Sequence, residues 1–315
     1  MHYLIVDGHC DSILEKVNKN RDLRINSKEG HLDFPRLLKS GVGVQFMALY
    51  IEDHYKPYNS VIRTLELIDI LKTEIKDLDY VKLVKDKNDL NNFSNDELKI
   101  ILAIEGGEAL AGKIEVLRCL YELGVRSLTL TWNQRNEIAD GAYEEPNGQG
   151  LSSFGRSVVS EMNKLGMLID VSHLAVNGFW DVIETSQFPI VASHSCCRSL
   201  TEHHRNLSDK QLKALAKNGG VIGINYCPDF LNKNPHNADI NDVIKHIVHA
   251  SEIMGTEHVG LGSDFDGIDC TPKGLEDVTK VPNLIVALER EGFTSREIGN
   301  IMGNNFLRIL KQVLK

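Results

Sequence analysis

Short apolar runs alternate with longer segments of helical periodicity along the whole chain. The apolar runs lack regular polar alternation, which is typical of strands buried on both faces of a parallel sheet. Eight such runs predict strands at residues 3–7, 43–51, 100–104, 126–131, 167–171, 190–193, 220–225 and 259–263. Between and after them, helical periodicity predicts helices at residues 61–75, 109–123, 154–164, 176–184, 208–217, 241–254 and 295–314.

Eight strand–helix units on a chain of 315 residues predict an α/β fold, namely a (β/α)8 TIM barrel. A doubly wound parallel sheet is the structural alternative, because it is built from the same alternating units. We find no low-complexity segment, linker or internal repeat in the sequence. We therefore expect one domain over residues 1–315.

Composition narrows the class of protein. Hydrophobic residues make up 42% and charged residues 25%, which is typical of a globular chain with a substantial core. The net charge of −9 argues against nucleic acid as a partner, since nucleic-acid binders normally carry a basic face. No run is long enough for a membrane span, and the first residues lack the pattern of a signal peptide. The cysteines contain no C-x-x-C pair, so we expect free thiols and a cytoplasmic location.

Polar residues follow the predicted strands at their carboxyl ends, where barrel enzymes carry their chemistry. Just after the first run, His9 and Asp11 are two residues apart, so an extended chain points both to one face and turns Cys10 away. Four further candidates end the third, fifth, sixth and eighth runs: Glu105, His173, His194 and Asp264.

Each of these residues alone has an ordinary structural explanation. Glu105 could cap a helix, either later histidine could bond to the backbone, and Asp264 could shape a loop. Together they predict a metal centre of the metal-dependent hydrolase type. Three histidines and three carboxylates exceed the needs of one zinc ion, so we expect two zinc ions sharing a bridging carboxylate. No lysine that could serve as the bridging ligand stands at these strand ends, so Glu105 is the candidate bridge.

The sequence resembles the membrane (renal) dipeptidase family, the zinc dipeptidases of the amidohydrolase-type barrels. The motifs that carry the resemblance span residues 7–267 in the family's order, and they are D-G-H-C-D, A-I-E-G-G, L-T-L-T-W-N, D-V-S-H, S-H-S, H-R-N-L and G-L-G-S-D-F-D-G. The resemblance implies one zinc on His9 and Asp11, a bridging Glu105, and a second zinc on His173 and His194.

The resemblance also implies residues that act on the substrate. Asp264 would be the acid/base residue beside a bridging water. Arg205, eleven residues after His194, matches the arginine that binds the terminal carboxylate of the substrate. Tyr226 is a weaker match for a second residue at that carboxylate.

The fourth predicted strand departs from the family pattern. Trp132 follows L-T-L-T, where familiar members of the family have a histidine that contacts the substrate and the developing oxyanion. Indole offers one donor and no acceptor. Either the Trp132 N–H, Asn133 or Arg135 supplies the missing donor, or the substrate differs.

We therefore predict a di-zinc dipeptidase that cleaves short peptides by attack of a metal-bridging hydroxide, with a D-residue possible at the second position. The alternatives are a barrel metallohydrolase acting on a lactam, lactone or N-acyl amino acid, and a non-catalytic metal-binding barrel. The resemblance also allows a homodimer. We expect His203 and His204 to face solvent, and Cys10, Cys196 and Cys197 to be structural.

Overall fold

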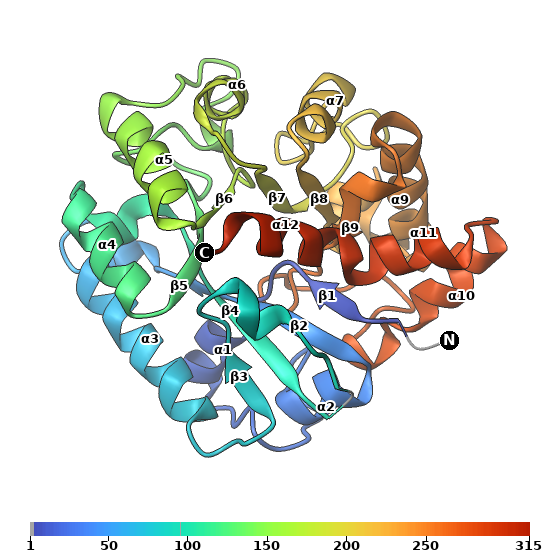
Figure 1. The fold of residues 1–315 in the computed structure, drawn as a ribbon. Coiled ribbons are helices and arrows are strands. Elements are labelled where there is room, and N and C mark those ends of the chain that lie inside the picture. The colour runs from blue at the N-terminus through green and yellow to red at the C-terminus, as the bar shows by residue number, and fades with distance from the viewer. Residues whose placement is uncertain (1–2, 95) are drawn as a thin grey trace.

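The computed structural model describes residues 3–94 and 96–315 and contains a closed barrel of parallel strands (Figure 1). The barrel strands are β1 (Ile5–Asp7), β2 (Val42–Tyr50), β4 (Leu98–Glu105), β5 (Val125–Thr129), β6 (Leu168–Asp170), β7 (Val191–Ser195), β8 (Val221–Ile224) and β9 (Val259–Leu261). The ring closes because β1 pairs with both β2 and β9, and β2 pairs with β4. Each predicted run overlaps one of these strands. The TIM barrel is confirmed, and the doubly wound alternative is wrong.

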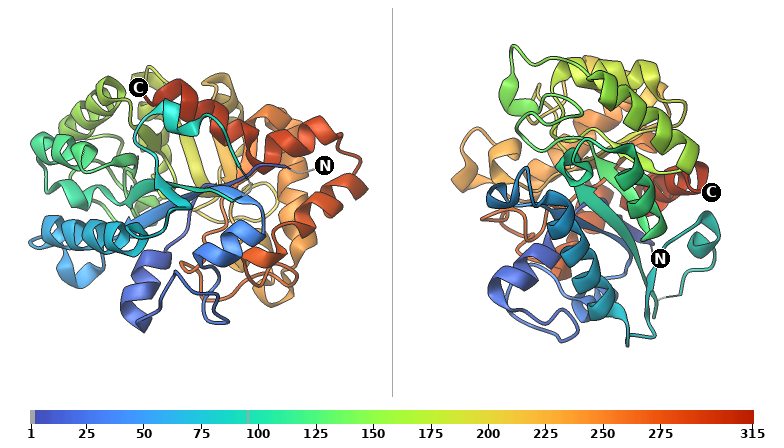
Figure 2. Two further views of the ribbon diagram at one scale, coloured as in Figure 1. Left: turned by 60° about the horizontal axis from the view of Figure 1, so that its bottom comes forward. Right: turned by 90° about the vertical axis from the view of Figure 1, so that its left-hand side faces the viewer.

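Helices surround the barrel, as the two views of Figure 2 show. They are α1 (Ser12–Lys19), α2 (Phe34–Lys39), α3 (Ser60–Ile75), α4 (Ile114–Glu122), α5 (Ser153–Leu165), α6 (Val176–Thr185), α7 (Asp209–Lys217), α8 (Pro228–Leu231), α9 (Ile240–Met254), α10 (Asn283–Arg290), α11 (Ser295–Gly299) and α12 (Asn305–Val313). Within the described part of the chain, none of them is both long and apolar enough to cross a membrane.

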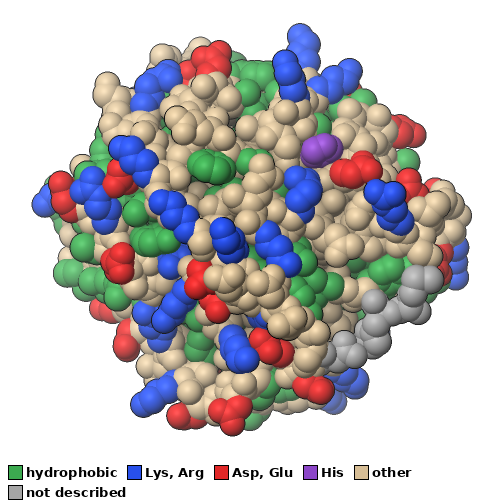
Figure 3. Space-filling model, in the orientation of Figure 1, with side chains coloured by type: hydrophobic (Ala, Val, Ile, Leu, Met, Phe, Trp, Pro, Cys, Tyr) green, Lys and Arg blue, Asp and Glu red, His purple; other side chains and the backbone are tan. Residues whose placement is uncertain are grey.

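The last helix closes the end of the barrel where the strands begin. Phe306 and Leu310 of α12 pack in one buried cluster with Leu168, Val191 and Val221, the first residues of β6, β7 and β8. In Figure 1, α12 lies across the barrel end nearest the viewer. Lys and Arg side chains, with Asp and Glu among them, are scattered over this face in Figure 3. The other end of the barrel, where the strands finish, is left for the site.

The structure differs from the predicted elements in several short segments. The strand β3 (Val81–Leu83) beside β4 and the helices α1, α2 and α10 are not predicted by the periodicity. The predicted helix at 109–123 begins only at Ile114, because a short 3₁₀ turn comes first and Gly112 has a positive φ of 67°. The predicted final helix is divided by a π-helical turn between α11 and α12.

Candidate metal centre and active site

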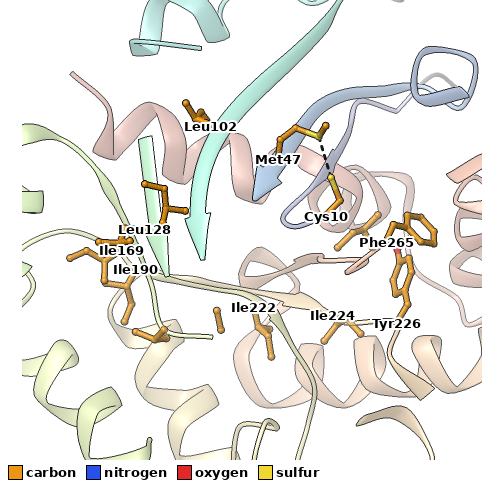
Figure 4. Close-up of a cluster of buried hydrophobic side chains, with 14 of the residues drawn as sticks. Cys10, Met47, Leu102, Leu128, Ile169, Ile190, Ile222, Ile224, Tyr226 and Phe265 are labelled. Atoms are coloured by element: carbon orange, nitrogen blue, oxygen red, sulfur yellow. Dashed lines mark hydrogen bonds between the residues drawn. The ribbon is translucent and has the colours of Figure 1, made fainter. Parts of the chain in front are cut away.

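Residues that follow five different strands converge on one cavity of about 490 Å³ at the carboxyl ends of the strands. Asp11, Glu105, His173, Arg205 and Asp264 line this cavity. Cys10 lies on the opposite side of its strand end, where its Sγ atom is 3.2 Å from Met47 Sδ in the buried core (Figure 4). The pleat of the first strand end therefore separates the polar pair from the cysteine.

The first group of candidate ligands surrounds the imidazole of His9, which is buried beneath the cavity. His9 Nε2 lies 3.3 Å from Asp11 Oδ2, 3.7 Å from Glu105 Oε1 and 3.9 Å from Asp264 Oδ1. Burial disfavours a charged His9, but the negative charges of Asp11 and Glu105 outweigh it and raise its pKa to about 10. Three carboxylates around one nitrogen make a site that favours binding of a cation.

The second group places two imidazoles against the same carboxylate. His173 Nε2 and His194 Nε2 are 2.8 Å apart, and Glu105 Oε1 is 2.9 Å from the first and 3.4 Å from the second. Burial lowers the pKa of both histidines well below the ordinary value, because it disfavours the charged form. Burial and the charge of Asp11 raise the pKa of Glu105 well above its usual range.

The donor set fits bound metal ions. His9 Nε2 and Asp11 Oδ1 are buried and make no hydrogen bond within the described residues. Such orphaned polar atoms are costly unless another group satisfies them. Neutral imidazole nitrogens and carboxylate oxygens are the ligand types that zinc accepts. Glu105 reaches both groups, which is the position a bridging ligand needs.

Two of the site residues have strained backbones. His173 has a φ of 66° and Asp264 a φ of 61°, in the left-handed region that non-glycine residues rarely occupy. Hydrogen bonds hold both in place: Ala142 N–H donates to His173 O at 2.7 Å, and Asp264 N–H donates to His9 O at 3.2 Å. Strain of this kind gathers at functional sites, where the surrounding structure maintains it.

Two polar residues position Asp264 and its loop: Asn225, which sequence reasoning missed, and Asp266, which it considered only as a residue that shapes the loop. Asn225, at the end of a predicted strand, donates from Nδ2 to Asp264 Oδ2 at 2.9 Å. Asp266 accepts from the backbone N–H of His31 at 2.7 Å and pairs with the buried Arg21 at 3.0 Å. Asp266 is the second aspartate of the D-F-D-G motif, so the motif itself points to this residue.

Arg205 is buried at the cavity, with 4% of its surface exposed. Its Nη2 donates to His194 O at 3.1 Å, and its Nε is unpartnered within the described residues. No described carboxylate lies within ion-pair distance of it, although the charges of Asp264 and Glu105 act on it from farther away. Burial lowers its pKa. The guanidinium is thus a buried cation that lacks a direct anionic partner.

The residues expected to contact substrate separate into two sets. Trp132 lines the cavity, with its ring centroid 5.0 Å from that of Tyr50. Asn133 also lines it, but its Oδ1 is 2.7 Å from His173 Nδ1 and so supports a candidate ligand. Arg135 instead pairs with Asp140 outside the cavity lining. Of the three donors considered at this strand end, the Trp132 N–H and the Asn133 Nδ2 amide are left, because only Asn133 Oδ1 is engaged by His173.

Tyr226 lies in the hydrophobic cluster and is absent from the cavity lining. Its side chain is fully buried and packs edge-on against Phe265, with ring centroids 5.6 Å apart (Figure 4). A direct contact with the substrate carboxylate does not follow from this placement. His203 and His204, which we expected to face solvent, are half-buried and line the cavity beside Arg205. Cys196 and Cys197 are buried, as a structural role requires.

Comparison with known proteins decides the family. The family model described as membrane dipeptidase, peptidase family M19, matches residues 1–315. The chain belongs to this family. An uncharacterized dipeptidase of Schizosaccharomyces pombe is 38% identical, over 99% of this chain and 80% of the relative. The M19 family groups metallopeptidases of the dipeptidase type, so the hydrolase class that the metal-type residues predict is supported.

Solved metallopeptidase structures share the whole fold. The dipeptidase AC, a metallopeptidase of family M19, superposes with a TM-score of 0.92 at 27% identity, covering 100% of this chain and 99% of that one. A metallopeptidase from Rhodobacter sphaeroides, liganded with a phosphinate mimic of the dipeptide L-Ala-D-Ala, has a TM-score of 0.91 at 27% identity and covers 99% and 100%. The chain therefore shares its whole fold with these solved metallopeptidases.

Proposed function

We propose that this M19 protein is a zinc-dependent dipeptidase that cleaves dipeptides with a free terminal carboxylate. The observation that carries the proposal is Arg205, a buried cation without a direct anionic partner at the wall of the cavity that holds the metal-type ligands. A planar guanidinium pairs with a carboxylate through two parallel hydrogen bonds. A substrate carboxylate would supply the partner that the protein itself does not.

The two ligand groups would hold two zinc ions. His9 and Asp11 would bind one, His173 and His194 the other, and Glu105 would contact both. Bound zinc supplies an acidified water as the nucleophile and polarises the scissile carbonyl. The 490 Å³ cavity is in the size range of small-molecule sites.

Asp264 would move the proton in this reaction. Asn225 holds its Oδ2, which leaves Oδ1 facing His9 Nε2 at 3.9 Å and the cavity. The carboxylate would accept a proton from the attacking water and deliver it to the leaving amine, which must be protonated to depart. Each cycle would return Asp264 to its starting ionised form.

The proposal also covers the configuration of the second residue of the substrate. The Rhodobacter sphaeroides relative holds a mimic of L-Ala-D-Ala. We propose that this chain also accepts a D-residue there, with Trp132 and Tyr50 forming an aromatic wall beside the substrate. The cytoplasmic location, the homodimer and the single domain remain predictions.

Turnover on a matched panel tests the function. We expect zinc-loaded protein to hydrolyse L,L and L,D dipeptides and to lose this activity when the C-terminus is amidated, because Arg205 then meets no carboxylate. N-acetylated dipeptides, which are blocked at the N-terminus and keep the carboxylate, are the control. Protein shown to hold two zinc ions that cleaves no dipeptide would contradict the proposal, and lactams, lactones and N-acyl amino acids would become the substrates to assay.

Removal of the metal should destabilise the fold. The buried carboxylates and the imidazoles that face them would lose the cation they share. A ligand present at 100 times its Kd adds about 2.7 kcal/mol to the free energy of unfolding. We expect a chelator to lower Tm by on the order of 5 °C and added zinc to restore it. Magnesium added in place of zinc is the control, since it disfavours imidazole ligands. A Tm unchanged by chelation, with zinc shown to be removed, would contradict this expectation.

A further inference from the structure

A buried carboxylate that belongs to neither ligand group lies directly behind the metal centre. Asp170 is the last residue of β6, and 2% of its surface is exposed. Its Oδ1 accepts from the backbone N–H groups of Ser172 at 3.0 Å and Ser193 at 2.9 Å. Its Oδ2 accepts from Thr129 Oγ1 at 2.7 Å and from Ser193 Oγ at 2.5 Å. All the hydrogens at Asp170 are supplied by its neighbours, as an ionised carboxylate requires.

The hydroxyl of Ser193 connects this carboxylate to a candidate ligand. Ser193 Oγ is also 2.8 Å from His194 Nδ1. A serine hydroxyl has one hydrogen, and Asp170 can only accept, so that hydrogen points to Asp170. Ser193 Oγ must then accept from His194, and the imidazole hydrogen lies on Nδ1. The lone pair of His194 is left on Nε2, which faces Glu105 Oε1 at 3.4 Å.

We propose that Asp170 and Ser193 are positioning residues that fix the tautomer of His194, so that Nε2 is always free to bind the metal. This inference rests on the proposed metal function of His194. The second imidazole is held differently, because His173 Nδ1 meets the neutral side chain of Asn133. A carboxylate behind a ligating histidine orients the ring and increases its basicity toward the metal. In this protein, Ser193 lies between the carboxylate of Asp170 and the ring of His194 and connects the two.

Replacing Asp170 by asparagine should reverse the direction of the hydrogen bonds that run from residue 170 through Ser193 Oγ to His194 Nδ1. The amide oxygen can retain the two backbone N–H donors, which places the amide NH₂ where Oδ2 was. It would then donate to Ser193 Oγ, and the serine hydrogen would turn toward His194 Nδ1. The imidazole hydrogen would move to Nε2, the atom that should face the metal. A nearly isosteric substitution therefore predicts the wrong tautomer.

The experiment compares Asp170→Asn and Ser193→Ala with Thr129→Val as the matched control. Thr129→Val also removes a hydroxyl donor from Asp170 Oδ2 but leaves the Ser193 connection intact. Zinc affinity is measured by competition with a chromophoric chelator, and the His194 tautomer by ¹⁵N NMR of metal-free protein. For Asp170→Asn we expect about 10- to 100-fold weaker zinc binding and an Nε2–H imidazole. Thr129→Val should keep wild-type affinity and the Nδ1–H form.

Ser193→Ala keeps the proposal testable if Asp170→Asn does not fold. It leaves His194 Nδ1 without its partner, so we expect both tautomers and a weaker zinc affinity. Folded Asp170→Asn protein with wild-type zinc affinity and an Nδ1–H imidazole would overturn the proposal. If the wild type binds no zinc, the proposed function fails, and an Nε2–H form of His194 in wild-type apoprotein would overturn the inference by itself.

Discussion

Asp264→Asn should lower kcat by about 10²- to 10⁴-fold, the usual contribution of a positioned acid/base group. Asparagine has nearly the same shape and tolerates the left-handed φ of 61° at this position. Its amide oxygen can still accept from Asn225 Nδ2, so the side chain keeps its orientation. What it loses is the ability to accept and release a proton. Steady-state kinetics on a hydrolysed dipeptide, with zinc content measured on the same sample, checks the result.

Asp269→Asn is the matched control for this substitution. Asp269 is exposed at the rim of the same cavity, so its replacement changes the cavity charge equally and leaves the ligand groups untouched. We expect its kcat to stay near the wild-type value. Asp264→Asn protein that retains both zinc ions and full turnover would show that the proton is carried by another group.

The barrel could be predicted from the sequence because its strands carry a strong local signal. Strands buried on both faces are continuous apolar runs, and each predicted run overlaps an observed barrel strand. The short β3 has the sequence V-K-L, which is too brief and too mixed to stand out. The helix α1 begins directly after Asp11, so the strand-end motif conceals its start.

The candidate metal centre could be predicted because it depends on position along strands. His9 and Asp11 share a face by pleat alternation, and barrel topology brings the other strand ends beside them. Residues that act through hydrogen bonds have no such signal. Asp170 stands within D-V-S-H like any strand-end aspartate, and only the fold shows that Ser193 connects it to His194.

Side-chain direction in loops also escaped sequence reasoning. His203 and His204 are in a loop, where exposure is the common outcome, yet the loop folds over the cavity with Arg205. Tyr226 directly follows Asn225 near the end of β8, and neighbouring residues on an extended segment face opposite ways. Asn225 bonds to Asp264, so Tyr226 is directed into the core against Phe265.

Arg205→Ala should weaken catalysis on free dipeptides without weakening the fold. Loss of one partner of a buried charge pair costs about 2–5 kcal/mol, or roughly 30- to 5,000-fold in kcat/KM. We expect most of this loss to appear in KM, since the carboxylate contact is made before the chemical step. In the free protein, the substitution removes a buried cation that has no direct anionic partner. The free energy of unfolding should therefore stay level or rise.

Arg205→Lys separates charge from geometry at the same position. Lysine keeps the positive charge but lacks the planar fork, so its kcat/KM should fall between those of the wild type and the alanine variant. C-amidated dipeptides supply the substrate control: they lack the carboxylate, so Arg205→Ala should change their slow hydrolysis far less than that of free dipeptides. An equal loss on both substrates, or a fall in kcat with KM unchanged, would mean that Arg205 acts on the reacting centre and does not recognise the substrate terminus.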